Sequence, residues 1–116
     1  MLYGIADCTL MPSLDLEGFG LATAESLACG TPVMASRAGA NPELITPLGD
    51  ALLFEPGDAE SIAATLQRVA SGRLTLPGRD ACAEYAQREF RWDRPADAIE
   101  RSFDSVALLG WPEGLA

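Results

Sequence analysis

Histidine and lysine are both absent from this chain of 116 residues. Without histidine, the chain lacks the commonest general base and the commonest metal-binding side chain. Without lysine, it can form no Schiff base and cannot supply the lysine of a Walker-type phosphate loop. The sequence therefore excludes the catalytic and metal-binding chemistries that depend on either side chain.

Basic residues of any kind are few. Eight arginines face 17 acidic residues, which gives a net charge of −9. This balance argues against a surface for nucleic acid or anionic membrane, because both need clustered cations. Cysteine is also scarce: Cys8, Cys29 and Cys82 show no CxxC spacing. We expect them to be buried thiols in a reducing compartment, not disulfides or a zinc site.

Long apolar runs are missing too. No segment approaches the roughly 20 apolar residues that a membrane span requires. The first residues lack the basic region of a signal peptide, so we expect a cytoplasmic protein. The length suits one domain over residues 1–116, with residues 110–116 expected to be a frayed tail.

Short apolar segments alternate with helical patterns along the chain. The expected strands cover residues 8–11, 32–36 and 51–54, and the expected helices cover residues 20–29, 59–71, 79–89 and 95–109. The opening residues are typical of a helix end. This alternation predicts an α/β fold, a partial Rossmann-like parallel sheet of about three strands flanked by helices.

Three further details refine these helices. Asn41 is the expected N-cap of a short helix with Pro42 at its first position, and Pro47 should end that helix after about one turn. Gly30 stands where a helix usually stops, and Asp58 should cap the helix over residues 59–71. In that helix, Ile62, Leu66 and Val69 follow an amphipathic stripe.

The segment from Glu17 to Glu25 is the most informative part of the chain. It reads Glu-Gly-Phe-Gly-Leu-Ala-Thr-Ala-Glu and follows a strand that ends at Pro12. A strand, a glycine turn and a helix start build an anion pocket, because the first amides of a helix have no internal partner. Gly18 and Gly20 allow the backbone to approach a ligand closely.

The two glutamates have a structural and a functional interpretation each. On a helical wheel, Glu25 shares an arc with Leu21, Ala24 and Ala28, which places it on the expected core-facing stripe. There it either accepts hydrogen bonds from backbone amides or lies at the stripe's edge, or it binds vicinal hydroxyls such as those of a ribose. Glu17 is either an exposed loop acid or a ligand-binding group above the end of the first strand.

Residues 17–33 resemble the Glu-x7-Glu signature of the family 4 retaining glycosyltransferases, which have the GT-B fold. Four other segments are similar to motifs of the same family, in the same order along the chain. They are Tyr-Gly-Ile-Ala-Asp at residues 3–7, Ser-Arg-Ala-Gly-Ala-Asn-Pro-Glu at 36–43, Leu-Phe-Glu-Pro-Gly-Asp at 53–58 and Phe-Arg-Trp at 90–92. The resemblance covers roughly residues 3 to 105.

The resemblance implies a nucleotide-sugar site. In such a site, Glu17 would bond the ring hydroxyls of the donor sugar as the catalytic-site carboxylate, and Glu25 would hold the ribose hydroxyls. The amides of Gly18, Phe19, Gly20 and Leu21 would contact the sugar and the diphosphate. The substrate would be a UDP-, GDP- or ADP-sugar, and neither a metal nor another cofactor is implied. Asp15 and Glu17 alone make a poor metal site, because no histidine or third acid lies nearby.

The resemblance also implies that parts of the family's architecture lie outside the sequence. The chain resembles the distal part of the C-terminal GT-B domain, without that domain's first strands and without the N-terminal acceptor domain. We therefore expect the chain to be inactive alone, and a parent protein peripheral to a membrane remains open. Arg37 is the one cation near the diphosphate, or else a solvated loop residue.

Two alternatives remain open. The chain could be a non-catalytic module that dimerises through an open sheet edge. A flavodoxin-like receiver fits less well, because the chain lacks a lysine and an aspartate cluster at strand ends.

Overall fold

The computed structural model describes residues 2–15 and 17–109. In this part of the chain, three short parallel strands form one sheet in the order β1-β2-β3. The strands are β1 (Thr9–Met11), β2 (Val33–Ser36) and β3 (Leu53–Phe54). Thr9 pairs with Val33, and Ala35 pairs with Leu53. The predicted α/β fold with a three-stranded parallel sheet is confirmed.

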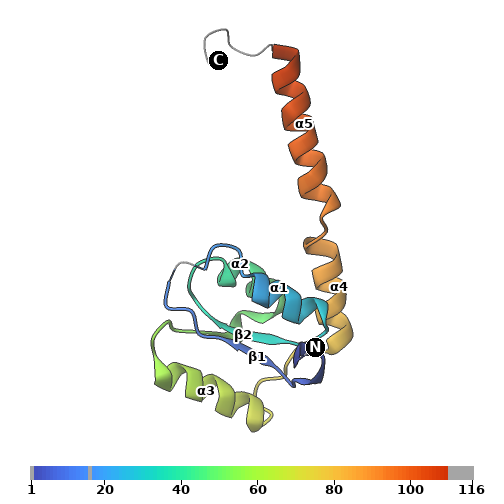
Figure 1. The fold of residues 1–116 in the computed structure, drawn as a ribbon. Coiled ribbons are helices and arrows are strands. Elements are labelled where there is room, and N and C mark those ends of the chain that lie inside the picture. Colours follow the sequence, from blue (N-terminus) through green and yellow to red (C-terminus); the bar gives the residue numbers. More distant parts are fainter. Residues whose placement is uncertain (1, 16, 110–116) are drawn as a thin grey trace.

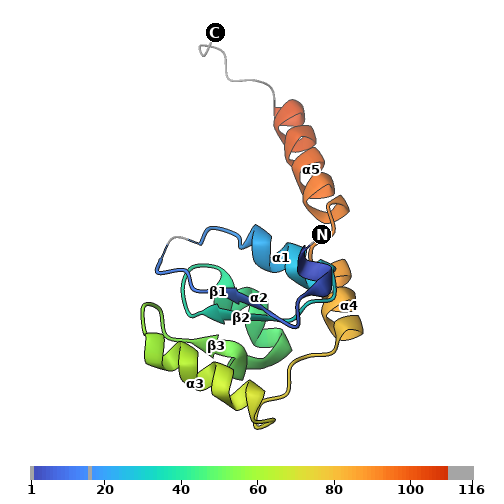
Figure 2. The ribbon, with the colours of Figure 1, turned by 60° about the horizontal axis from the view of Figure 1, so that its bottom comes forward.

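Helices occupy both faces of this sheet. The α-helices are α1 (Leu21–Ala28), α2 (Asn41–Gly49), α3 (Ala59–Ala70), α4 (Arg79–Glu89) and α5 (Asp93–Leu109), and the 3-10 helices are η1 (Leu2–Ile5) and η2 (Asp50–Leu52). Figure 1 shows α1 and α2 on one side of the sheet and α3 on the other, and Figure 2 shows the same layers from a second direction. α4 packs along α1. The β-α-β connections bring the carboxyl ends of the strands to one edge.

The core lies around β2, whose four residues are all buried. Leu27 of α1, Ile45 of α2 and Tyr85 of α4 belong to the same buried cluster as the apolar residues of this strand. A partly buried hydroxyl pair also joins α1 to β1, because Oγ of Ser26 and Oγ1 of Thr9 lie 2.8 Å apart. The central strand is therefore buried along its whole length, and apolar from Val33 to Ala35, as expected for a parallel strand covered on both faces.

The second helix differs from the sequence prediction. Asn41 is not its N-cap but its first residue, and Ala40 occupies the cap position. Pro47 does not end the helix, which continues to Gly49. A proline inside a helix costs roughly 3 kcal/mol. Burial of Leu44 and Ile45 on the core side offsets that cost, at about 1.5–3 kcal/mol per side chain.

Most other element boundaries differ from the predicted ones by one or two residues. The last helix begins at Asp93 rather than Pro95, and the opening residues form a 3-10 turn. The predicted start and end of α4 are confirmed, as are the cap at Asp58 and the stop at Gly30, which has φ of 75°. Leu66 was expected on the buried stripe of α3, but it is 36% exposed, and Thr65 is buried in its place. The predicted tail, residues 110–116, lies outside the described residues.

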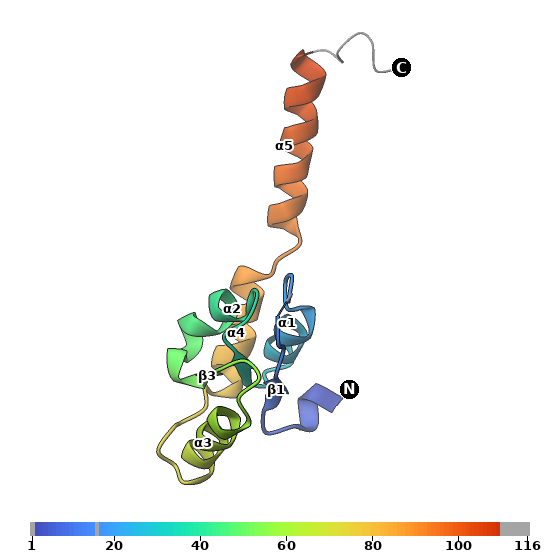
Figure 3. The same ribbon diagram turned by 90° about the vertical axis from the view of Figure 1, so that its left-hand side faces the viewer.

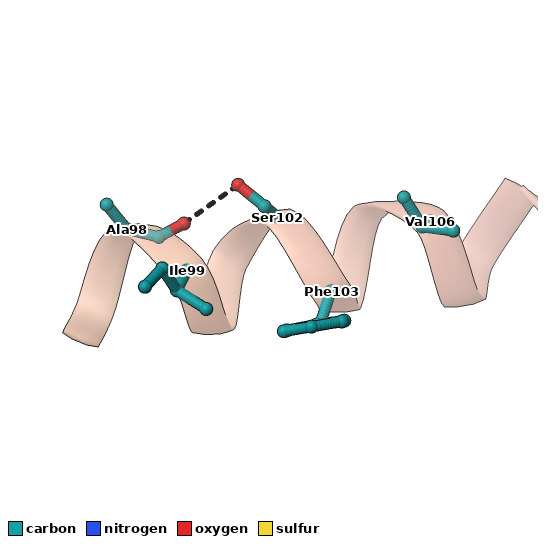
Figure 4. A pocket seen from close by; sticks show the side chains of 5 residues that line it. All are labelled: Ala98, Ile99, Ser102, Phe103 and Val106. Atoms are coloured by element: carbon teal, nitrogen blue, oxygen red, sulfur yellow. Dashed lines mark hydrogen bonds between the residues drawn. The ribbon is translucent and has the colours of Figure 1, made fainter. Parts of the chain in front are cut away.

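Helix α5 points away from the rest of the molecule, as Figures 1 and 3 show. This projection gives the chain a longest dimension of 64 Å, against 30 and 24 Å for the other two. Residues 93–106 are all exposed. Figure 4 shows Ala98, Ile99, Ser102, Phe103 and Val106 along this helix, where they border a shallow hollow. Phe103 is 71% exposed, so α5 carries an apolar stripe that nothing in the described chain covers.

Candidate donor-binding site

The candidate site begins in the segment that leads from β1 to α1. Gly20 closes this segment with φ of 79°, a left-handed conformation that favours glycine. A Cβ atom at Gly20 would lie 2.7 Å from Cδ1 of Leu44. Gly20 therefore allows both the turn and the close packing of α1 against α2.

Glu17 is held at both ends of its carboxylate. Its Oε1 accepts a hydrogen bond from the backbone N–H of Gly20 at 3.1 Å, and its Oε2 accepts one from Oγ of Ser13, also at 3.1 Å. The side chain is half-buried. The sequence reasoning missed Ser13, although its position just after Pro12, at the end of the strand, was the available signal. These bonds fix the carboxylate at the carboxyl end of β1, beside the start of α1.

The backbone of Glu17 rests directly on Gly39. A Cβ atom at Gly39 would lie 2.2 Å from the carbonyl oxygen of Glu17 and 2.7 Å from its nitrogen. That same carbonyl accepts a hydrogen bond from the N–H of Ala40 at 2.9 Å. The loop after β2 therefore positions the backbone of Glu17 through a close contact and a hydrogen bond. The sequence did not reveal this role of Gly39.

The start of α1 has no side-chain cap among the described residues. The N–H groups of a helix's first turn have no partner inside the helix, and they carry part of the positive end of its dipole. Leu21, the first residue of α1, is 62% exposed. This end of α1 can therefore donate hydrogen bonds to an anion.

Glu25 does not lie on the buried face of α1, contrary to the prediction. The buried residues of this helix are Thr23, Ala24, Ser26 and Leu27, whereas Glu25 is exposed. The predicted arc was shifted, because α4 and the sheet cover Leu27 and its neighbours on the helix. Leu21, Glu25 and Ala28 instead border an open hollow.

The hollow has a volume of about 690 Å³ and lies between α1 and the junction of α4 and α5. Its wall on the α1 side consists of Phe19, Leu21, Ala24, Glu25 and Ala28. Its opposite wall consists of Glu89, Phe90, Arg91, Trp92, Arg94 and Pro95. The glycine loop, the start of α1 and the Glu25 carboxylate thus share one open, mostly apolar space.

Two phenylalanines join the loop to α4. The rings of Phe19 and Phe90 lie 6.1 Å apart in a T-shaped arrangement, and Phe90 makes a similar contact with Tyr85 at 5.6 Å. Such spacings are typical of favourable edge-to-face pairs. Phe90 was noted in the sequence only as part of a motif, and its contact with the loop was not foreseen.

Arg37 is occupied by acidic neighbours. Its Nη2 lies 2.6 Å from Oδ2 of Asp50, and its Nε lies 3.7 Å from Oε1 of Glu55. The hydrogen bond from Arg37 holds the pKa of Asp50 below its ordinary value, and the same bond raises the pKa of Arg37. A diphosphate would have to compete with two carboxylates for this guanidinium.

Residues 2–15 and 17–109 contain no group of three or more acidic or cysteine side chains placed to hold a metal ion. No helix in these segments is long and apolar enough to cross a membrane.

Comparison with known proteins identifies the family. Residues 1–89 match the family model described as Glycosyl transferases group 1. The chain is 42% identical over 101 residues to a D-inositol 3-phosphate glycosyltransferase of Saccharomonospora viridis, covering 84% of this chain and 22% of that protein. It is 35% identical over 107 residues to a GDP-mannose-dependent alpha-(1-6)-phosphatidylinositol dimannoside mannosyltransferase of Mycobacterium tuberculosis, covering 92% of this chain and 27% of that protein.

A solved structure agrees with the sequence matches. Sucrose-phosphate synthase from Thermosynechococcus elongatus superimposes with a TM-score of 0.80 at 29% identity, covering 94% of this chain and 27% of that one. The chain thus spans about a quarter of the length of these proteins. With 89 of its 116 residues matched by the family model, the chain belongs to the group 1 glycosyl transferases.

Proposed function

We propose that this chain supplies part of the nucleotide-sugar site of a family 4 retaining glycosyltransferase, one that transfers a sugar to an acceptor without a metal ion. In this proposal, Glu17 bonds the hydroxyls of the donor sugar. The amides of Gly18, Phe19, Gly20 and Leu21 contact the sugar and the diphosphate, and Glu25 binds the ribose. The mycobacterial relative is named for its dependence on GDP-mannose, which supports a nucleotide-sugar donor.

One observation carries the proposal. Leu21 and Glu25 border the same hollow from the same face of α1. Four residues of an α-helix span about 6 Å along its axis. A phosphate bound at the first amides of α1 would therefore lie about 6 Å from the Glu25 carboxylate, which is roughly the length of a ribose. A nucleoside diphosphate laid along α1 would therefore place its phosphates at the helix start and its ribose hydroxyls at Glu25.

The chemistry of Glu17 follows from its position. A carboxylate held by Ser13 and by the Gly20 amide cannot turn freely, so its orientation is set before a ligand arrives. Fixed negative charge beside the donor sugar would stabilise positive charge that develops on the ring as its bond to phosphate breaks. The donor phosphate itself would take the acid–base role, which suits a chain without histidine. Residues 1–116 span about a quarter of the relatives' length, and we expect no transfer by these residues alone.

Calorimetric titration tests the proposal. The ligands are UDP-, GDP- and ADP-sugars together with the matching nucleoside diphosphates, and the proteins are the wild type, Glu17→Gln and Glu84→Gln. Glutamine at position 17 can keep both hydrogen bonds, with its oxygen accepting from Gly20 and its amide donating to Ser13, so the variant removes the charge and not the loop. Glu84 is an exposed residue of α4 and serves as the matched control.

We expect the wild type and Glu84→Gln to bind the nucleotide sugar of one base, and its matching nucleoside diphosphate, with equal affinities. Glu17→Gln should lower the affinity for the nucleotide sugar and leave the affinity for the nucleoside diphosphate unchanged. Absence of binding to every ligand would reject the proposal, and sugar transfer by the isolated chain would reject the expectation of inactivity.

A second candidate function rests on α5. Its exposed stripe of Ile99, Phe103 and Val106 favours a module that associates with another protein surface or with a second copy. Light scattering separates the two candidates: a stable dimer without nucleotide affinity would favour the association module.

A further inference from the structure

Phe90 is the residue of the Phe-Arg-Trp motif that contacts the glycine loop. It follows the last residue of α4 and lies where the chain turns into α5. Its ring is half-buried against the core, and its edge-to-face partners are Phe19 on one side and Tyr85 on the other. The contact joins two segments that are 71 residues apart in the chain.

The buried residue Tyr85 holds Phe90 in place. Tyr85 is only 7% exposed and belongs to the buried core, and Arg88 lies over its ring at 5.6 Å. Phe90 packs on that ring, so its position is set by α4 and not by the loop. Phe19 is 52% exposed, so its contact with Phe90 is among the few that can restrain it.

The loop itself has little else to hold its tip. In the sequence Gly18-Phe19-Gly20, Phe19 has the only side chain. A Cβ atom at Gly18 would meet nothing within 4 Å, so the backbone there lies in open space. Gly20 itself is buried at the start of α1, where its carbonyl accepts a hydrogen bond from the N–H of Ala24 at 2.9 Å. The tip that lacks such restraint is therefore Gly18 and Phe19, and the hydrogen bond from the Gly20 N–H to Glu17 depends on how that tip is placed.

We propose that Phe90 is a positioning residue that holds the Gly18–Gly20 loop in its sugar-binding shape through the ring of Phe19. Loss of the aromatic edge at position 90 releases Phe19, loosens the tip, and lets the Gly20 amide leave Glu17. This inference rests on the proposed function for the part that concerns sugar binding. The restraint on the loop is a property of the free protein and can be measured without a ligand.

The first measurement is amide hydrogen exchange at Gly20, followed by NMR on the whole chain. Phe90→Leu keeps an apolar side chain but removes the ring, and Phe90→Tyr restores a ring. Val69→Ala is the control, because Val69 is half-buried on α3, which lies on the other face of the sheet, and its truncation lowers stability without touching the loop. We expect Gly20 to exchange about two- to tenfold faster in Phe90→Leu, the range that corresponds to one aromatic pair. Phe90→Tyr and Val69→Ala should match the wild type.

The second measurement compares the affinities for GDP-mannose and GDP, or for UDP-glucose and UDP, whichever pair the wild type binds. A loss of folded protein weakens the binding of both ligands by the same factor. A loosened loop weakens the binding of the nucleotide sugar more than that of the nucleoside diphosphate, because the loop amides contact the sugar as well as the diphosphate. We expect the sugar's contribution to affinity to fall about two- to tenfold in Phe90→Leu and to return in Phe90→Tyr.

The outcomes separate the inference from the proposed function. If Gly20 exchanges no faster in Phe90→Leu than in Val69→Ala, the restraint by Phe90 is refuted, whatever the ligands do. If the exchange result holds but the wild type binds no nucleotide, the proposed function is rejected and the restraint on the loop stands. If the wild type binds and the two affinities fall together in Phe90→Leu, the positioning role in sugar binding is refuted.

Discussion

Replacing Gly39 by alanine tests how the site is built, because the backbone of Glu17 packs directly against this glycine. The φ of Gly39 is 53°, and a Cβ atom at this position would lie 2.2 Å from the carbonyl oxygen of Glu17 and 2.8 Å from the Cβ of Glu17. The atoms in the way include backbone, which cannot swing aside as the end of a side chain can. Gly39→Ala must therefore push the two loops apart, which breaks the hydrogen bond from Ala40 to Glu17.

The expected cost has two parts. The left-handed backbone conformation costs alanine roughly 1–2 kcal/mol, and the overpacking costs typically about 1–3 kcal/mol more. Gly72 separates these parts, because its φ is 72° and a Cβ atom there would meet nothing within 4 Å. Gly72→Ala should lose only the conformational part, roughly 1–2 kcal/mol, whereas Gly39→Ala should lose about 2–5 kcal/mol of unfolding free energy.

Urea denaturation followed by circular dichroism measures both variants against the wild type. Titration with the preferred nucleotide sugar then tests the site, and Gly39→Ala should lose affinity while Gly72→Ala keeps it. Equal losses of unfolding free energy in the two variants would show that Glu17 does not rest on Gly39, and the account of how the site is held would fail.

Three smaller predictions follow from single residues. Asp58→Ala removes the carboxylate that caps two amides at the start of α3, and it should cost about 1 kcal/mol of unfolding free energy in urea denaturation. The bond from Arg37 lowers the pKa of Asp50, so the pair's contribution to stability is present above the ordinary value of 3.8 and is lost as pH falls through the lowered pKa; Asp50→Asn should flatten the acid limb of a stability–pH curve, and an unchanged limb would contradict the pairing. Burial raises the pKa of both the Cys8 and the Cys82 thiol, but Cys82 is 0% exposed and Cys8 is half-buried. Mass spectrometry after an iodoacetamide pulse at neutral pH should therefore find Cys8 modified before Cys82, and the reverse order would contradict the burial of Cys82.

Much of the fold could be predicted because its signals are local. The parallel sheet followed from apolar segments alternating with helical patterns, and the cap at Asp58 and the stop at Gly30 followed from residue type. The second helix was mispredicted, because Pro47 is a local signal that the burial of Leu44 and Ile45 overrides. Burial depends on which element packs on which, and a single sequence does not show that.

The sequence named candidate residues for the site but did not show how they are held. The Glu-x7-Glu motif named Glu17 and Glu25, yet the helical wheel placed Glu25 toward the core, because it could not show that α4 covers the neighbouring face. The residues that hold the loop were missed for a related reason. Gly39 and Phe90 act on it from 19 or more residues away, through a close backbone approach and a ring contact that only the fold creates.

The central claim is that Glu25, exposed in the hollow beside α1, recognises a ribose. The direct measurement is the affinity of the wild type and of Glu25→Ala for the preferred nucleoside diphosphate and for its 2′,3′-dideoxy form. We predict that the wild type binds the ribose form more tightly, and that Glu25→Ala binds both forms alike, with the affinity that the wild type shows for the dideoxy form. If the wild type does not distinguish the two forms, or if Glu25→Ala still does, Glu25 is not the ribose-binding residue and the proposed site is wrong.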